Sequence, residues 1–410
     1  MEQFLEKAKS ASRVLATMSG SERNRILREM AESLRANTMN IIEANAIDMR
    51  SADENNISPS MKERLLLDEK RIEAMAVAIE EIAALKDPIG KVIEGWVTEA
   101  GLKIEKVSIP IGVIGIIYES RPNVTSDTAA LCFKSSNGCV LKGGKEAETS
   151  NKIIADVLQQ VLLRNNLPKE LIALLPDASR EGVAKLIKMD KYVDLIVPRG
   201  GEALIRFVSQ NASIPVIKHD KGQCHLYIDK DAKIQDALRI AVNAKVQRPS
   251  ACNSIETLLV DSVVALEVLP LMKEVFDREN TQLKGCEQTR EIIAIEKASE
   301  EDFDTEYLAN ILNIRVVDGV EGAISHIVRF GSGHSESIIT ENITTAEKFM
   351  NSIDASTLYV NASTRFTDGG MFGFGAEVGI STSKLHARGP MGIEGLTTYK
   401  YKVYGKGQIR

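Results

Sequence analysis

The chain has 410 residues, of which 44% are hydrophobic and 26% charged, and its formal net charge is −6. This length is sufficient for two domains with a large buried core each, and the composition is that of a globular protein rather than a disordered or fibrous one. The negative charge argues against general binding to nucleic-acid phosphates, and no apolar run approaches the ~20 residues of a membrane span.

The first 86 residues are predicted to be helical. Apolar residues recur at intervals of three and four, as in RNRILREMAESLRANTMNIIEAN, and prolines are almost absent. Residues 1–23 are charged and amphipathic without a continuous apolar core, so we expect no secretory signal. Residues 96–109 alternate as in β-strands around Gly101, which predicts a projecting hairpin.

Strands and helices alternate after residue 110. The segments IGVIGIIYE, CVLK, ELIALLP and VDLIVP are short and apolar, and helical patterns over residues 126–136, 148–164 and 181–189 separate them. Such alternation predicts a parallel, doubly wound sheet that is covered on both faces. This first α/β domain is expected to end near residue 218.

A second α/β region is predicted from residue 225 onward. Its strand-like segments include HLYID, SIETLLV and TLYVN, with a helix over residues 234–245. Residues 365–379 are glycine-rich but too apolar for a linker, which indicates a structured loop. The expected domains are residues 1–218, residues 219–385, and a C-terminal return over residues 386–410.

The cysteines are five in number and include no C-x-x-C pair: Cys132, Cys139, Cys224, Cys252 and Cys286. This pattern fits neither a disulfide framework nor a zinc site, so we expect no metal and a reducing cytoplasm. Cys252 lies between a polar loop and an apolar strand, which suits an exposed, reactive thiol. Because a cysteine is more often a small buried hydrophobe, the residues alone leave a structural role open.

Three segments resemble the aldehyde dehydrogenase superfamily, and specifically its γ-glutamyl phosphate reductase branch. Residues 247–252 resemble the active-site cysteine loop, and residues 317–340 (VDGVEGAISHIVRFGSGHSESIIT) resemble the signature of this branch. The segment from VNASTRFTDGG to LTTYKY is similar nearly throughout. Phe330 departs from the signature, where Tyr or His is usual. The resemblance spans essentially the whole chain and implies two doubly wound α/β domains plus a small β oligomerisation element. It implies that residues 1–218 bind the nucleotide, that residues 219–385 form the catalytic cysteine domain, and that residues 386–410 include an oligomerisation strand.

The resemblance implies a cysteine-dependent reduction of γ-glutamyl phosphate to glutamate 5-semialdehyde, in proline biosynthesis. Cys252 would form a thioester, and the Asn123 side chain with the backbone N–H of Cys252 would hold the oxyanion. Without the resemblance, Asn123 is as readily explained by an Asx turn after Pro122. Two alternatives stay open: a CoA-acylating semialdehyde dehydrogenase, and a non-catalytic relative.

A glutamate that activates water in hydrolytic relatives is missing here. Its usual position falls near Lys218 and His219, and no glutamate occurs between Glu202 and Glu256. Because an activated water would waste a thioester that exchanges with phosphate, the absence favours phosphate-linked or CoA-linked chemistry. His219 is a candidate proton donor or phosphate contact, although a lone histidine is more often structural.

The cofactor is expected beyond the carboxyl end of the strand CVLK, at the turn formed by Lys142, Gly143, Gly144 and Lys145. NAD-preferring relatives usually have a glutamate at the position of Lys145, so a lysine that can pair with a 2′-phosphate favours NADP(H). Either lysine could instead be a solvated surface charge.

A second phosphate-binding turn is expected at Gly200 and Gly201, which precede a helix whose N-terminus offers free N–H groups. Glu306 resembles the glutamate that touches the nicotinamide ribose. Arginines beside the predicted site are candidates to bind the anionic groups of the substrate: Arg121, Arg248 and Arg365.

The hairpin at residues 96–109 and the C-terminal strand resemble the oligomerisation elements of the superfamily, which implies a homodimer or homotetramer. The resemblance also implies a glutamate 5-kinase as a possible partner that supplies the acyl phosphate.

Overall fold

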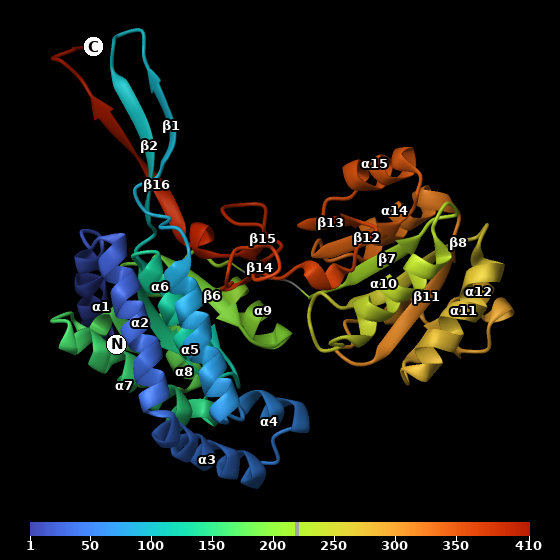
Figure 1. Cartoon of the computed structure of the whole chain (residues 1–410), viewed down its shortest axis with the longest axis horizontal. Helices are drawn as coiled ribbons and strands as arrows, with labels where there is room; N and C mark the ends of the chain where they lie inside the picture. Colours follow the sequence, from blue (N-terminus) through green and yellow to red (C-terminus); the bar gives the residue numbers. More distant parts are fainter. Residues whose placement is uncertain (218–220) are drawn as a thin grey trace. The chain divides into compact units, whose positions relative to one another are not determined.

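The computed structural model describes residues 1–217 and 221–410. The described chain divides into two compact units (Figure 1). The first unit comprises Met1–Lys218, Gly373–Gly379 and Met391–Arg410, and the second comprises His219–Phe372 and Ile380–Pro390. Each unit contains its own parallel sheet with helices, so the predicted α/β class with two doubly wound parts is confirmed. Among the described residues, every helix is too short or too polar to cross a bilayer.

The chain begins with consecutive helices, as the periodicity predicts: α1 (Glu2–Leu15), α2 (Gly20–Ala36), α3 (Thr38–Glu54), α4 (Pro59–Leu65) and α5 (Glu69–Ala84). Ser19 starts α2 with a capping box, because its hydroxyl accepts from the Glu22 N–H and its own N–H donates to the Glu22 carboxylate. Arg35 on α2 pairs with Glu73 and Glu80 on α5, which aligns the two helices.

The sheet of the first unit has the strand order β5-β4-β3-β6, and each neighbouring pair is parallel. Its strands are β3 (Val113–Tyr118), β4 (Gly138–Lys142), β5 (Ile172–Leu174) and β6 (Leu195–Arg199). The helices that follow them are α6 (Asn123–Lys134), α7 (Glu148–Arg164), α8 (Arg180–Leu186) and α9 (Glu202–Asn211). Alternate strand residues such as Val113 and Ile117 pack with α1, α8 and α9. The carboxyl ends of β3, β4 and β6 therefore share one edge of the sheet.

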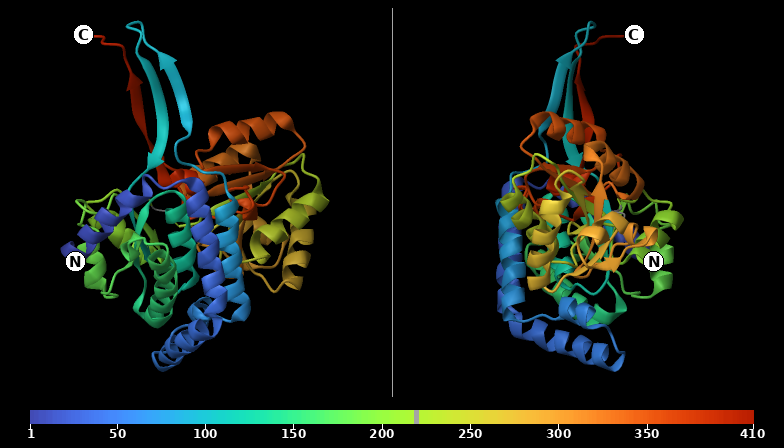
Figure 2. Two further views of the ribbon diagram at one scale, coloured as in Figure 1. Left: turned by 60° about the vertical axis from the view of Figure 1, so that its left-hand side comes forward. Right: turned by 90° about the vertical axis from the view of Figure 1, so that its right-hand side faces the viewer.

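An antiparallel sheet projects from the first unit (Figures 1 and 2). Its order is β1-β2-β16, with bounds Val92–Val97, Lys103–Pro110 and Thr397–Tyr404. The hairpin predicted from residue 96 thus begins earlier, at Val92. Trp96 and Tyr401 remain 41% and 54% exposed although their rings meet edge to face at 6.1 Å. These exposed aromatic side chains suit the predicted oligomerisation element, which stays a prediction.

The sheet of the second unit has the order β10-β9-β11-β8-β7-β12-β13 with parallel pairs. Its strands are β7 (Cys224–Ile228), β8 (Ile255–Asp261), β9 (Gln282–Gly285), β10 (Glu296–Lys297), β11 (Ile311–Val317), β12 (Ser335–Ile339) and β13 (Thr357–Val360). Its helices are α10 (Ile234–Val246), α11 (Ala265–Arg278), α12 (Glu287–Ile292), α13 (Glu300–Phe303), α14 (Gly319–Phe330) and α15 (Ile343–Ser352). Two short strands, β14 (Gly379–Ser381) and β15 (Gly389–Met391), pair separately.

Helices cover both faces of this second sheet. Leu258 and Val260 face the core that α10 and α11 complete, whereas Leu259 between them faces the core of α14 and α15. This alternation follows from the two-residue period of a strand. Because both faces are buried, the strands read as continuous apolar runs, which explains why SIETLLV is recognisable in the sequence.

Candidate active site

Cys252 lies in the loop between α10 and β8, in the second unit. Two main-chain hydrogen bonds shape this loop, from Ala251 N to Arg248 O at 3.0 Å and from Ser254 N to Ala251 O at 2.9 Å. Cys252 is partly exposed, whereas Cys132, Cys139 and Cys224 are buried. A thiol at a loop that precedes a buried strand is therefore available to a ligand and held by a rigid scaffold.

The segment before β7 packs directly against the main chain of Cys252. A Cβ atom placed on Gly222 would lie 2.0 Å from the Cys252 carbonyl oxygen, so only glycine fits there. The thiol of Cys224 donates to the same oxygen at 3.3 Å. Burial, and then the charge of Glu336, raise the pKa of the Cys224 thiol, which therefore stays protonated and able to donate.

A chain of buried polar side chains continues behind Cys224. His334 Nδ1 lies 3.6 Å from Cys224 Sγ and 2.8 Å from the Ser335 hydroxyl. The Ser335 hydroxyl lies 2.7 Å from that of Thr367, which is 2.8 Å from the Tyr359 hydroxyl. His334 and Ser335 belong to the predicted signature segment, so this segment supports the Cys252 loop through Cys224.

The glycine-rich stretch is tied to the Cys252 loop through Asn253. The Asn253 side chain donates to the Thr367 carbonyl at 2.8 Å, and the Thr364 hydroxyl donates to the Asn253 carbonyl at 2.6 Å. Arg365, between them, donates from Nε to Gln247 at 3.0 Å. Burial, and then the charge of Arg248, lower the pKa of Arg365. The structure thus brings two predicted arginines together beside the Cys252 loop.

A buried ion pair flanks this loop. Lys245 Nζ lies 2.8 Å from Glu256 Oε2, and both side chains are fully buried. Burial raises the pKa of Glu256 to about 7 and lowers that of Lys245. Glu306 lies partly buried in the segment between α13 and β11, and its charge also acts on Lys245.

Phe330, the departure from the signature, fills an aromatic cluster. Its ring centroid lies 4.7 Å from that of His326 and 6.0 Å from that of Phe303. Nearby, His225 Nδ1 lies 2.9 Å from Glu336, and both side chains are fully buried. Phe330 therefore contributes apolar packing at a position where a Tyr or His could donate a hydrogen bond.

In the first unit, Asn123 is the first residue of α6 and follows Pro122, whose φ of −58° suits a helix start. The predicted helix start at residue 126 was therefore three residues late, and Asn123 is helical rather than part of an Asx turn. Its Nδ2 atom donates to Asp127 Oδ2 at 2.9 Å. Arg121, just before Pro122, is partly buried.

The loop that leads to Asn123 is linked to the predicted cofactor turn. Ser120 has a φ of +43° and donates both its N–H and its hydroxyl to Glu146, at 2.6 Å and 2.8 Å. These two bonds hold a residue in a left-handed conformation that non-glycine residues rarely adopt. On the other side, Gly201 N–H donates to the Glu119 carboxylate at 2.9 Å, so the Gly200–Gly201 turn lies next to the same loop.

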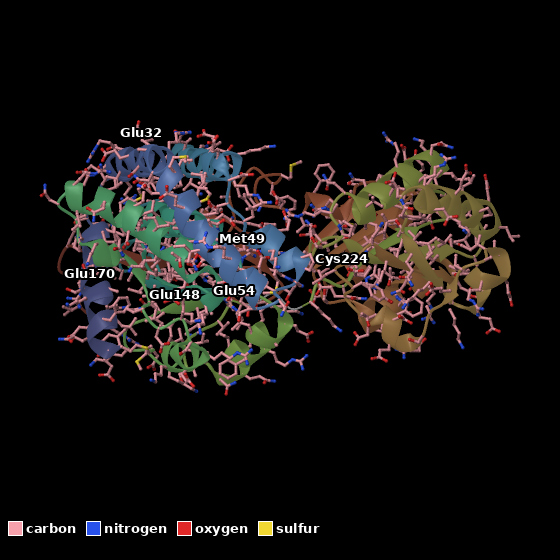
Figure 3. The ribbon with its side chains drawn as sticks, turned by 90° about the horizontal axis from the view of Figure 1, so that it is seen from below. Glu32, Met49, Glu54, Glu148, Glu170 and Cys224 are labelled. Atoms are coloured by element: carbon pink, nitrogen blue, oxygen red, sulfur yellow. The ribbon has the colours of Figure 1, made fainter. Side chains whose placement is uncertain are left out.

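The predicted cofactor turn opens onto a cavity. A Cβ atom on Gly143 would lie 2.1 Å from Asn151, and Lys142 Nζ donates to the Ala178 carbonyl at 2.7 Å, whereas Lys145 is exposed. The cavity has about 550 Å³ and is lined by Gly143, Gly144, the α7 residues Glu148, Asn151, Lys152, Asp156 and Gln159, and residues of α1 and β5. Figure 3 labels Glu148 and Glu170, which both line it.

The structure places the predicted residues in two groups. Cys252, Arg248, Arg365 and Glu306 belong to the second unit, and the following belong to the first: Arg121, Asn123, Lys142, Gly143, Gly144, Lys145, Gly200 and Gly201. Lys218 and His219 lie outside the described residues. In the described part of the chain, no group of three or more His, Cys, Asp or Glu side chains is arranged to hold a metal ion.

Several residues with close contacts to the site were not anticipated from the sequence. Asp127 could have been found, because it follows Asn123 by four residues in a helical pattern. Gly222 and Cys224 carry no local signal, since their importance depends on contacts across the fold. Gln247 belongs to the predicted cysteine loop, but its bond to Arg365 was not anticipated.

The chain is similar to known proteins over its whole length. The model of the aldehyde dehydrogenase family matches residues 1–282. A protein of Sulfurovum sp. (strain NBC37-1) named gamma-glutamyl phosphate reductase is 75% identical, and one of Sulfurimonas denitrificans with the same name is 72% identical, each with 100% of both chains covered. The crystal structure of gamma-glutamyl phosphate reductase from Thermotoga maritima is 45% identical, with a TM-score of 0.97 over 100% of this chain and 99% of that one.

Proposed function

The chain belongs to the aldehyde dehydrogenase family, and from this premise we propose that it reduces L-γ-glutamyl 5-phosphate with NADPH to L-glutamate 5-semialdehyde and phosphate. The observation that carries the proposal is the full-length 75% identity to a relative with this activity in its name. The partly exposed Cys252 in a loop supported by His334 and Ser335 supports it chemically.

In this proposal the Cys252 thiolate attacks the acyl carbon, the bond to the phosphate oxygen breaks, and a thioester forms. A nicotinamide cofactor, when bound, supplies the hydride that converts the thioester to a thiohemiacetal on Cys252. This species collapses with cleavage of its C–S bond, which releases the aldehyde and the thiolate. The Cys252 N–H and the Asn123 amide stabilise the oxyanion at both tetrahedral stages.

The substrate carries a phosphate and a carboxylate, and we assign the arginines to these anions. Arg365 is the strongest candidate to bind an anion. Its Nε atom is held by a hydrogen bond to Gln247 at 3.0 Å, and burial, and then the neighbouring positive charge of Arg248, lower its pKa. A second positive charge close by favours an anionic ligand, which would neutralise both. Arg121 is assigned to the same substrate from its place before Asn123.

The proposal includes NADP(H) as the cofactor. Lys145 is exposed at the Gly143–Gly144 turn beside the cavity of about 550 Å³, where a cation could pair with a 2′-phosphate. The Gly200–Gly201 turn is assigned to the pyrophosphate and Glu306 to the nicotinamide ribose. Five cysteines that form no disulfide among the described residues support a reducing cytoplasm as the location. The exposed aromatic residues of the projecting sheet support a homodimer or homotetramer.

The reverse reaction tests the proposal. Purified protein is incubated with glutamate 5-semialdehyde, NADP⁺ and phosphate, and NADPH absorbance is followed. We expect phosphate-dependent NADPH formation that vanishes in Cys252→Ala. Equal turnover without phosphate would mean that water cleaves the thioester, and turnover only with CoA would establish the CoA-acylating alternative. No turnover under any of these conditions would overturn the proposal in favour of a non-catalytic role.

A further inference from the structure

We propose that Asp127 is a positioning residue that orients the amide of Asn123, so that one of its N–H groups faces the oxyanion formed at the substrate carbonyl. The inference rests on the proposed function, because that function gives Asn123 its role. It adds a residue to the reaction that acts through Asn123 rather than on the substrate.

The hydrogen bond between Asn123 and Asp127 determines which side of the Asn123 amide, the NH₂ group or the Oδ1 atom, faces Asp127. Asn123 and Asp127 are four residues apart on α6 and therefore lie on the same face of the helix. Asn123 Nδ2 lies 2.9 Å from Asp127 Oδ2. A carboxylate can only accept hydrogen bonds, so it holds the NH₂ group of the amide on its own side. The second N–H of that group can then donate to another acceptor, and the amide cannot turn its Oδ1 atom toward Asp127 without repulsion between the two oxygens.

Asp127 is itself held in place. The Ser126 hydroxyl lies 3.3 Å from Asp127 Oδ1 and 2.9 Å from the Asn123 carbonyl, and the positive charge of Arg199 acts on the carboxyl group. The position near the N-terminus of α6 also favours a negative charge. The N-cap residue of α6 is Pro122, and the hydrogen bond to Asp127 orients the Asn123 side chain at this helix start.

A double-mutant cycle separates positioning from a general structural role. The variants are Asn123→Ala, Asp127→Ala and the double variant, with steady-state kinetics of the phosphate-dependent reaction. We expect Asn123→Ala to lower kcat by about 10²–10³-fold, as for loss of one oxyanion donor. Asp127→Ala should lower kcat by about 10–100-fold with little change in the KM of the semialdehyde, because misplaced groups cost this much. In the Asn123→Ala background, Asp127→Ala should have no further effect.

Two further variants control the test. Thr128, the next residue on α6, donates its hydroxyl to the Val124 carbonyl at 2.6 Å, so Thr128→Val perturbs the same helix but should keep the wild-type kcat. Asp127→Asn retains an acceptor oxygen and keeps the test valid where Asp127→Ala fails to fold. Its kcat should fall between those of wild type and Asp127→Ala, because an amide can also present the wrong atom.

The outcomes distinguish this inference from the proposed function. Multiplicative effects of the two alanine substitutions, or wild-type kcat in both Asp127 variants, would overturn the role of Asp127 and leave the reaction standing. Absence of turnover in the wild-type protein would overturn the reaction, and the role of Asp127 would fall with it.

Discussion

The thiol of Cys224 donates a hydrogen bond to the main-chain carbonyl of Cys252, with a sulfur-to-oxygen distance of 3.3 Å. One cysteine thus supports the backbone of the other, and the two thiols have different environments. Cys224 is fully buried, whereas Cys252 is partly exposed. The same fold therefore makes one thiol available for chemistry and keeps its neighbour protonated.

Thiol labelling should distinguish these cysteines. We expect iodoacetamide to label Cys252 with parallel loss of activity, because Cys252 is partly exposed, whereas burial shields the Cys224 thiol and raises its pKa. Cys286 is also partly exposed and should be labelled without loss of activity. Peptide mass spectrometry against time of reaction measures each site. Early label on Cys224 would contradict the assignment, and the Cys252→Ala protein serves as the control.

Gly222→Ala should inactivate the protein. The new methyl carbon would lie 2.0 Å from the Cys252 carbonyl oxygen and 2.8 Å from Cys252 Cα, so the nucleophile loop must move. A shift of about 1 Å at a reacting group can cost on the order of 10²-fold in rate. We expect this loss in kcat at an unchanged KM for NADP⁺. Gly322→Ala in α14, where the nearest atom is 3.3 Å away, should keep its activity. Equal kcat in both variants would refute the steric argument.

Breaking the buried Lys245–Glu256 pair should destabilise the chain strongly. Lys245→Met leaves the Glu256 carboxyl buried without its partner at 2.8 Å, which costs about 3–5 kcal/mol in comparable pairs. Lys273→Met, at the more exposed pair with Asp277, should cost less than about 1 kcal/mol. Urea unfolding of both variants measures the difference in the free energy of unfolding. Similar urea midpoints for the two variants would show that the buried pair contributes no more to the free energy of unfolding than the surface pair.

The alternation of elements could be read from the sequence because both sheets are buried on two faces. Their strands are continuous apolar runs, and helix α7 was predicted with the bounds Glu148–Arg164 that it has. The start of α6 was missed, because Pro122 permits a helix to begin at Asn123 where a turn was equally plausible from local sequence. Strand order and the return of residues 373–379 and 391–410 to the first unit depend on long-range packing and carry no local signal.

The sequence predicted where the candidate site lies better than it predicted the contacts that hold the site together. Cys252 stood out by its place between a polar loop and an apolar strand. Gln247, which fixes Arg365, and Gly222, which contacts Cys252, are ordinary residues until the fold brings them to their partners. Such contacts join segments that are 30 to 118 residues apart, as for Gly222 with Cys252 and Gln247 with Arg365, so periodicity and spacing cannot reveal them.

The Asp127 carboxyl should impose an acidic limb on the pH profile. Burial raises its pKa from 3.8 to about 6, although hydrogen bonds from Asn123 and Ser126 and the charge of Arg199 on β6 oppose this. A raised pKa means that the fold disfavours the carboxylate, so the contribution of this group to stability falls as pH rises from about 4 to 6. Activity should change in the opposite direction, because the carboxylate can only accept hydrogen bonds and so fixes the Asn123 amide more firmly than the protonated carboxyl, which can also present its O–H.

We therefore expect kcat to fall as pH decreases through about 6. Asp127→Asn, whose amide does not titrate, should lack this limb when measured in the same buffers with the same substrates. The ionisation of phosphate and substrate affects the pH profiles of both proteins alike, so a difference between the two profiles reports the Asp127 carboxyl. An unchanged limb in Asp127→Asn would assign the titration to another group.

Lys145→Glu should shift the cofactor preference from NADP(H) toward NAD(H). Lys145 is exposed at the Gly143–Gly144 turn, where a 2′-phosphate would gain a charge-assisted hydrogen bond of about 1.5–3 kcal/mol. Its loss corresponds to about a 10–150-fold fall in kcat/KM for NADP⁺. A glutamate could instead accept from the ribose hydroxyls of NAD⁺, so kcat/KM for NAD⁺ should rise or stay constant. Lys169→Glu makes the same charge change at a lysine that lines the cavity, away from the Gly143–Gly144 turn. If both variants lose NADP⁺ and NAD⁺ turnover equally, the effect is one of overall charge, and Lys145 does not read the 2′-phosphate.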